Sequence, residues 1–187
     1  MIRELADRIR SLKGAGPLIV SVDGRCGAGK TTLAESLHRL LEKSVVVHGD
    51  DFFLRDEQLH RRQVPGENID YERLIQEVLG PVRSGQDFVY RKFDCKNRSL
   101  DEGMVTACPE ILLLEGSYSQ NVHLAPYSDF RIFVDCDRET QKARICGRSP
   151  EKWEAFHTCW IPLEETYFER FNIKERADVR VCTSGKG

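Results

Sequence analysis

The feature that most constrains the fold is a glycine-rich octapeptide at residues 24–31, which reads Gly-Arg-Cys-Gly-Ala-Gly-Lys-Thr. It matches G-x-x-x-x-G-K-[ST], the pattern of a loop that binds phosphate groups between a strand and a helix. An apolar run at residues 17–22 precedes it, and apolar side chains recur at helical spacing from 33 to 41 behind it. These flanks predict a buried strand and an amphipathic helix, the context that phosphate binding requires.

The residues of this loop have separate predicted tasks. The glycines allow the backbone to turn its N–H groups toward a phosphate chain, and the helix N-terminus adds partial positive charge. Lys30 is expected to reach the β- and γ-phosphates, and the Thr31 hydroxyl to hold Mg²⁺. We therefore predict that ATP and Mg²⁺ are the cofactors. The expected nucleotide-binding residues are Gly24, Arg25, Cys26, Gly27, Ala28, Gly29, Lys30, Thr31 and Thr32.

Cys26 allows two interpretations. A thiol beside a helix N-terminus tends to have a lowered pKa, so Cys26 could be a reactive group that Mg-ATP protects from alkylation. Alternatively, a small side chain simply fits at this point of the loop.

Composition limits the class of protein. The 187 residues fit a single domain, and we expect residues 1–187 to form one P-loop domain. A net charge of −2 disfavours nucleic acid as a partner. Seven cysteines without a C-x-x-C pair predict reduced thiols in a cytoplasmic protein. The apolar stretches are too short to span a bilayer, so no membrane partner is expected. The expected partner is a small-molecule acceptor, and a homo-oligomer is left open.

Apolar strands alternate with amphipathic helices along the chain, which predicts an α/β fold with a parallel sheet covered by helices on both faces. Residues 88–93 are expected to form an excursion strand or hairpin arm, and Gly80-Pro81 to end the helix before it. Pro162 is expected either to kink a helical region or to begin a new helix. Further strands are predicted at 44–48, 111–114, 130–134 and 178–182, and helices at 1–12, 74–79, 138–147 and 151–171.

Carboxylates follow two of the predicted strands. Asp50 and Asp51 come directly after the strand at 44–48, and Glu115 ends the strand at 111–114. Ligands of open parallel sheets bind at the carboxyl ends of the strands, where the glycine loop also lies. Mg²⁺ and a hydroxyl nucleophile both need carboxylates there, although each residue taken alone could merely cap a turn or face solvent.

A basic segment at about 137–150 is predicted to be a small lid. On a helix, Arg144 and Arg148 share a face, as do Arg138 and Lys142. Their charges could close over the phosphates and stabilise the transferred group, since phosphoryl transfer must exclude water. The alternative is an ordinary solvated helix surface.

The stretches at 23–34, 48–53 and 113–116 resemble motifs of the uridine kinase-like P-loop kinases, which include nicotinamide riboside kinase and, more distantly, phosphoribulokinase and pantothenate kinase. The resemblance implies that Asp50 is the base for the substrate hydroxyl and that Glu115 serves the metal site with Thr31 and Asp50. Asn68-Ile69-Asp70 resembles a segment whose aspartate holds ribose hydroxyls, which implies that role for Asp70.

The acceptor side is implied by the same resemblance. Tyr90, Arg91 and Phe93 lie in or beside the stretch that corresponds to the base-binding segment, and they are expected to contact the acceptor. Residues 91–98 contain no histidine, where nucleoside kinases of this group have one. The implied reaction is transfer of the γ-phosphate of ATP to a hydroxyl, most favourably the 5′-hydroxyl of a nucleoside. A kinase for another hydroxyl metabolite, such as a vitamin precursor or sugar, and an ATPase or switch that acts through a protein partner are the alternatives.

Overall fold

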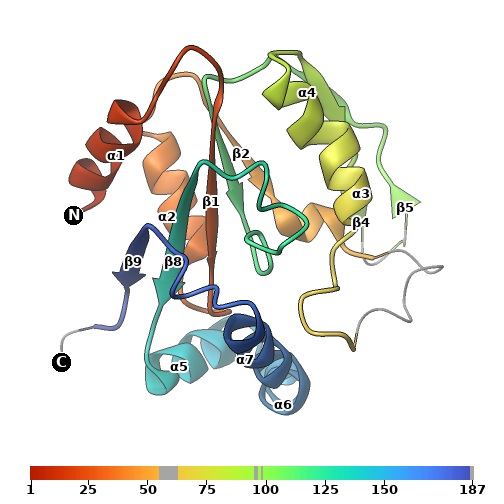
Figure 1. Cartoon of the computed structure of the whole chain (residues 1–187). Helices are drawn as coiled ribbons and strands as arrows, with labels where there is room; N and C mark the ends of the chain where they lie inside the picture. The colour runs from red at the N-terminus through yellow and green to blue at the C-terminus, as the bar shows by residue number, and fades with distance from the viewer. Residues whose placement is uncertain (55–62, 95–96, 98, 186–187) are drawn as a thin grey trace.

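A parallel sheet of five strands forms the centre of the computed structural model, which describes residues 1–54, 63–94, 97 and 99–185 (Figure 1). The strand order is β2-β7-β1-β8-β9, so the strand that leads into the glycine loop is central. The bounds are β1 Leu18–Gly24, β2 Ser44–His48, β7 Ile111–Glu115, β8 Phe130–Asp135 and β9 Val179–Cys182. The predicted α/β fold and its strands are confirmed.

Helices cover both faces of the sheet because its strands are apolar on both sides. Val20 and Leu113 belong to one buried cluster, which includes residues of α1 (Ile2–Ser11) and α2 (Lys30–His38). Ile19 and Leu112 alternate with them and belong to a second cluster on the other face. That cluster includes residues of α3 (Tyr71–Leu74) and α7 (Ile161–Arg170). Two buried faces are expected of a parallel sheet.

The helices after β8 gather at the end of the sheet where the strands finish (Figure 1). α5 spans Arg138–Arg148, and a short 3₁₀ turn, α6 (Trp153–Ala155) and a π-helical turn (Phe156–Trp160) lead into α7. Pro162 is the second residue of α7, and the backbone is helical without a break from Trp153 through the π turn into α7. Pro162 therefore lies inside a continuous helical stretch, directly after a π turn, and does not begin a separate helix.

The prediction that Gly80-Pro81 ends a helix is wrong. α3 continues through a π-helical turn at Ile75–Leu79 into α4, which spans Gly80–Arg83. A proline inside an α-helix normally meets a carbonyl of the preceding turn. The wider π turn ahead of Pro81 changes that spacing, so the helix can continue.

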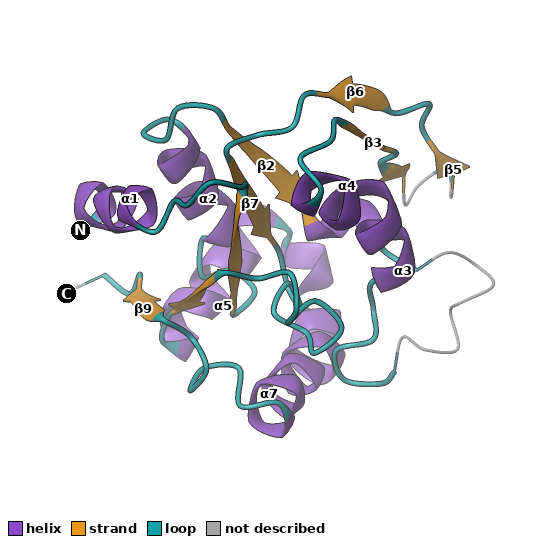
Figure 2. Cartoon of the chain, turned by 45° about the horizontal axis from the view of Figure 1, so that its top comes forward, coloured by secondary structure: helices purple, strands orange, loops and turns teal. Residues whose placement is uncertain are grey.

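Two small antiparallel ribbons lie beside α3 and α4, away from the main sheet (Figure 2). β3 (Phe88–Tyr90) pairs with β6 (Met104–Thr106), and β4 (Phe93–Asp94) pairs with β5 (Ser99–Leu100). The predicted hairpin arm at 88–93 is thus two short strands. In the part of the chain that the structure describes, no helix has the length and apolar character needed to cross a membrane.

Candidate active site

The glycine loop joins β1 to α2 and needs glycine for a steric reason. Gly24 has φ +131°, and a Cβ built on it would lie 2.0 Å from the carbonyl oxygen of Val134 in β8. Gly27 and Gly29 also have positive φ, at +74° and +93°. Only glycine adopts such a run of left-handed conformations without strain. The loop therefore has the backbone form that its sequence pattern predicts.

Lys30 is the first residue of α2, and its side chain is folded into the loop. Its Nζ donates to the carbonyl of Gly24 at 2.6 Å and to that of Arg25 at 3.1 Å. A third contact, 3.3 Å long, reaches Oγ of Ser117 behind β7. The residue is only 8% exposed, so the ammonium is satisfied by protein oxygens rather than by solvent.

Thr31 of α2 and Glu115 at the end of β7 are in contact. The Thr31 hydroxyl donates to Oε1 of Glu115 at 3.1 Å, and the same oxygen lies 2.5 Å from Nδ1 of His48. His48 pairs with Glu115 in the register of β2 and β7. The hydrogen bond and charge of Glu115 raise the pKa of His48. His48 was not predicted to contribute to the site.

The donor set suits Mg²⁺. Hydroxyl and carboxylate oxygens from Thr31, Glu115 and Asp50 are hard ligands, and Mg²⁺ commonly takes one or two carboxylates and completes its shell with phosphate and water. Among the described residues, no group of three or more His, Cys, Asp or Glu forms a metal cage by itself. The assignment of these three residues to a metal remains a prediction.

Asp50 and Asp51 have different surroundings in the 3₁₀ turn Gly49–Phe52. Removal from water raises the pKa of Asp50, Lys30 opposes that shift, and Glu115 adds to it. The pKa of Asp51 is also raised by burial, but the charges that oppose the shift there are Lys92, His48 and Arg73. Asp50 is thus electrostatically coupled to the lysine of the loop, and Asp51 to the acceptor side.

Close backbone contact brings these strand ends together. Gly49 precedes Asp50, and Gly116 follows Glu115. A Cβ on Gly116, whose φ is +143°, would lie 3.2 Å from the Cα of Gly49. Two glycines therefore let the ends of β2 and β7 approach, which places their carboxylates on one edge of the sheet.

The residues predicted to contact the acceptor have different immediate neighbours. Asp70 is 2% exposed and caps α3, accepting from the N–H of Arg73 at 3.2 Å. Tyr90 stacks on Phe52, with ring centroids 5.6 Å apart. Burial, above all, raises the pKa of Tyr90 to about 12.

Arg91 and Phe93 have other immediate neighbours. Arg91 donates to Oε1 of Glu77 through both Nε and Nη2, at 3.1 and 2.7 Å. Phe93 is buried. Residues 95, 96 and 98 of the stretch compared with the base-binding segment, and residues 55–62 before Asp70, lie outside the described residues.

The predicted lid arginines differ in their contacts. Nη1 of Arg144 donates to the carbonyls of Gly27 and Ala28 at 3.2 and 3.3 Å, and Nη2 donates to the carbonyl of Thr183 at 2.7 Å. Arg144 therefore fastens α5 to the glycine loop and to the end of β9. Arg148, one turn later, is exposed. Their roles toward the transferred phosphoryl group remain predictions.

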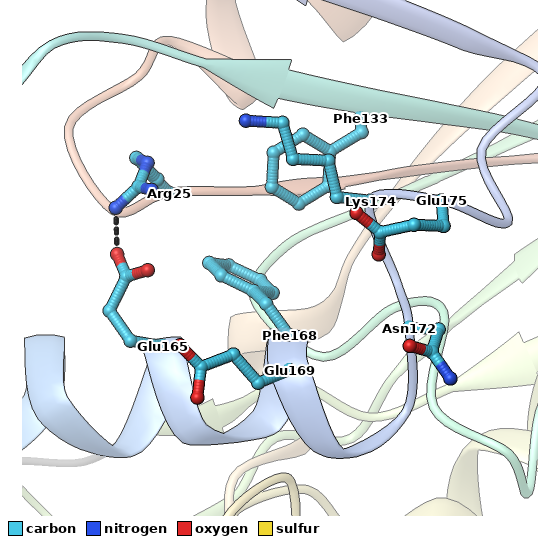
Figure 3. A pocket seen from close by; sticks show the side chains of 8 residues that line it. All are labelled: Arg25, Phe133, Glu165, Phe168, Glu169, Asn172, Lys174 and Glu175. Carbon is cyan, nitrogen blue, oxygen red and sulfur yellow. Dashed lines mark ion pairs between the residues drawn. The ribbon is translucent and has the colours of Figure 1, made fainter.

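The glycine loop and α7 are joined by hydrogen bonds that were not predicted from the sequence. The Cys26 N–H donates to Oε2 of Glu164 at 2.9 Å, and Ser117 donates to Oε1 of Glu164 at the same distance. Arg25 pairs with Glu165 on the outside of this joint (Figure 3). Nothing in the local pattern around residue 164 distinguishes it from a solvated helix glutamate, so only the fold reveals this contact.

The environment of Cys26 favours one of the two interpretations of its thiol. Burial and the nearby Glu164 carboxylate raise the pKa of Cys26, opposite to the effect of a helix N-terminus. Gln141 of α5 donates to the Cys26 carbonyl at 3.0 Å and lies 3.4 Å from its sulfur. The structure thus favours a small, enclosed side chain over a reactive thiol.

Sequence comparison finds relatives among curated kinases. A uridine kinase from Halalkalibacterium halodurans is 28% identical over 190 residues, which covers 92% of this chain and 89% of the relative. A nicotinamide riboside kinase from Eremothecium gossypii is 26% identical, covering 92% and 80%. A pantothenate kinase from Limosilactobacillus reuteri is 27% identical, covering 65% and 46%. The chain thus spans about half the length of the pantothenate kinase but most of the other two.

Structural comparison gives the same group. The solved structure of a possible uridine kinase from Bacillus stearothermophilus has a TM-score of 0.76 at 22% identity, with 96% of each chain covered. No protein-family model matches the chain. The fold is that of a P-loop kinase, and the predicted resemblance to uridine kinase-like P-loop kinases is confirmed. Together the relatives indicate a P-loop small-molecule kinase.

Proposed function

We propose that this chain transfers the γ-phosphate of ATP to a hydroxyl group of a small molecule, most favourably the 5′-hydroxyl of a nucleoside. One observation carries the proposal. The loop lysine Lys30, the Thr31–Glu115 pair and the Asp50 carboxylate come from three neighbouring strand ends, β1, β7 and β2. A donor phosphate, a metal and an acceptor hydroxyl need these groups side by side.

Each group has a distinct role in the proposed reaction. The N–H groups of the loop and Lys30 bind the phosphates and offset negative charge on the transferred group. Asp50 accepts the proton of the acceptor hydroxyl as it attacks. Thr31, Glu115 and Asp50 would hold Mg²⁺, which neutralises phosphate charge when bound. Arg144 and Arg148 act from the lid helix.

A nucleoside is the favoured acceptor for two reasons. The uridine kinase and the nicotinamide riboside kinase, whose matches cover most of their own length, are both named for ribosides. Asp70 is also buried at the start of α3, in the segment that resembles the ribose-binding stretch of those kinases. A carboxylate is suited to ribose because it can accept hydrogen bonds from both the 2′- and the 3′-hydroxyl.

Another hydroxyl metabolite is the second candidate. The pantothenate kinase is 27% identical, nearly the same as the uridine kinase at 28%, although the match spans a smaller part of it. An acceptor hydroxyl without a ribose would use Asp50, Lys30 and the metal in the same way. The two candidates therefore share one phosphoryl-transfer chemistry and differ in the acceptor molecule.

The test is a screen of ADP formation from Mg-ATP with ribonucleosides, their 2′-deoxy forms, and other alcohols including pantothenate and sugars. We expect at least one ribonucleoside to be phosphorylated, with its 2′-deoxy form turned over more slowly. Turnover of another alcohol alone would leave the kinase reaction standing and reject the nucleoside. ATP hydrolysis that no small acceptor stimulates would instead favour an ATPase or switch that acts through a protein partner.

A further inference from the structure

Helix α7 contacts the end of β1 and the glycine loop through three polar side chains near its middle. These contacts join residues 23–26 of the strand end and loop to residues 164–167 of α7. The contacts join Asp23 to Tyr167, Arg25 to Glu165, and Cys26 to Glu164. Figure 3 shows the Arg25–Glu165 pair beside the aromatic side chains of Phe133 and Phe168. The phosphate loop is therefore supported by a helix more than 130 residues away in the sequence.

Glu164 is the enclosed member of this set. It is 3% exposed, and both of its carboxylate oxygens accept a hydrogen bond at 2.9 Å, one from the Cys26 N–H and one from the Ser117 hydroxyl. A carboxylate removed from water is costly unless donors replace the water. Here the two donors belong to the loop and to the turn after β7. Glu164 thus fixes these two segments relative to each other.

Ser117 connects this carboxylate to Lys30. A serine hydroxyl has one proton and two lone pairs. Because the proton is donated to Glu164, the lone pairs are directed elsewhere, and Lys30 Nζ lies 3.3 Å from the same oxygen. The chain of contacts runs from the Cys26 amide through Glu164 and Ser117 to the ammonium of Lys30.

We propose that Glu164 is a positioning residue that orients Lys30 for the phosphate chain through Ser117. In this arrangement the motif lysine is not held by its own loop alone. The carboxylate fixes the rotamer of Ser117, and Ser117 fixes one direction of approach of the ammonium. The proposal rests on the proposed function only for its effect on turnover, because its effect on ATP affinity needs no acceptor.

The experiment compares Glu164→Gln and Ser117→Ala with Glu169→Gln, an exposed glutamate on the same helix. Glutamine can accept only one of the two hydrogen bonds, since its NH₂ group faces the other donor. We expect either test variant to weaken ATP binding, measured by calorimetry, by about tenfold, the cost of one hydrogen bond to a charged group. Glu169→Gln should leave the ATP affinity unchanged. Ser117→Thr keeps the hydroxyl and should therefore bind ATP as the wild-type protein does, unlike Ser117→Ala.

The double variant gives the decisive measurement. If Glu164 acts through Ser117, the double variant loses no more ATP affinity than the more affected single variant. Losses that multiply, unchanged affinity, or tighter ATP binding after removal of the Glu164 charge would each overturn the proposal. If Glu164→Gln does not fold, the comparison of Ser117→Ala with Ser117→Thr decides, with alanine and threonine behaving alike as the contrary result. If the wild-type protein binds ATP but phosphorylates no alcohol, the proposed function fails while these affinities still test the inference.

Discussion

The Thr31 hydroxyl donates a hydrogen bond to Oε1 of Glu115 across 3.1 Å, although the two residues are 84 positions apart in the chain. The contact exists because β7 pairs in parallel with β1, so the end of β7 lies beside the start of α2. β2 pairs with the other edge of β7 and brings Asp50 to the same side. Sheet order thus converts three separate sequence motifs into one site.

Replacement of Lys30 by alanine should abolish phosphoryl transfer. Removal of a preorganised charge is expected to lower kcat by roughly 10³-fold or more. The measurement is ADP formation with the acceptor found in the screen, with circular dichroism and thermal unfolding to show that the variant is folded. A folded Lys30→Ala variant with near-normal turnover would contradict the kinase assignment.

Asp50→Asn and Asp51→Asn should separate the base from its neighbour. Asparagine keeps the shape but cannot take the proton, so Asp50→Asn should lower kcat by about 10²–10⁴-fold with little change in ATP affinity. Asp51 lies near Lys92, and its charge contributes to the raised pKa of Tyr90, so Asp51→Asn should affect the acceptor KM more than kcat. The reverse result, with Asp51→Asn inactive, would move the base to Asp51.

Replacement of Arg144 or Arg148 by alanine should lower kcat more than it raises the KM for the acceptor. Charge on the transferred group is greatest in the transition state, where Arg144 and Arg148 are predicted to act. Arg144→Ala should also weaken ATP binding, because its guanidinium now bonds the carbonyls of Gly27 and Ala28. Steady-state kinetics of both variants test this. An unchanged kcat in both variants would show that α5 contacts the glycine loop but does not act on the transferred phosphoryl group.

Gly24→Ala should destabilise the fold itself. The new Cβ would lie 2.0 Å from the Val134 carbonyl oxygen at a backbone φ of +131°. Steric overlap and strain together should lower the free energy of unfolding by about 3 kcal/mol or more. Gly14→Ala is the matched control, since a Cβ there meets nothing within 4 Å. Urea unfolding of both variants gives the comparison, and equal stabilities would contradict the close packing of β1 and β8 at this point.

Cys26 should resist alkylation near neutral pH. Its raised pKa leaves almost no thiolate, which is the reactive form, whereas Cys159 and Cys182 are exposed. Iodoacetamide treatment followed by peptide mass spectrometry should therefore find these two cysteines modified first. In urea, Cys26 should react like the others, which is the control. Rapid modification of Cys26 in the folded protein, blocked by Mg-ATP, would instead support a reactive thiol.

The course of individual helices shows where local signals mislead. Gly80-Pro81 is a strong stop signal in sequence, yet the helix runs on to Arg83 through a π-helical turn. That turn packs Val78 and Leu79 into the core beneath β3, so burial outweighs the local preference. Pro162 has the same setting, since it also follows a π-helical turn and the helix runs on through it to Arg170.

The glycine loop, the strand before it, the helix after it and the carboxylates at the strand ends could all be predicted from the amino-acid sequence. Each of these features depends on a pattern of a few residues, so Lys30, Thr31 and Glu115 can each be recognised locally. What surrounds these residues follows from the packing of distant segments. Glu164 is an ordinary helix glutamate in sequence, and it becomes a buried acceptor for the loop because α7 packs on the sheet face beside β1. Contacts between residues more than a hundred positions apart follow from the packing of helices on the sheet, and no local pattern encodes them.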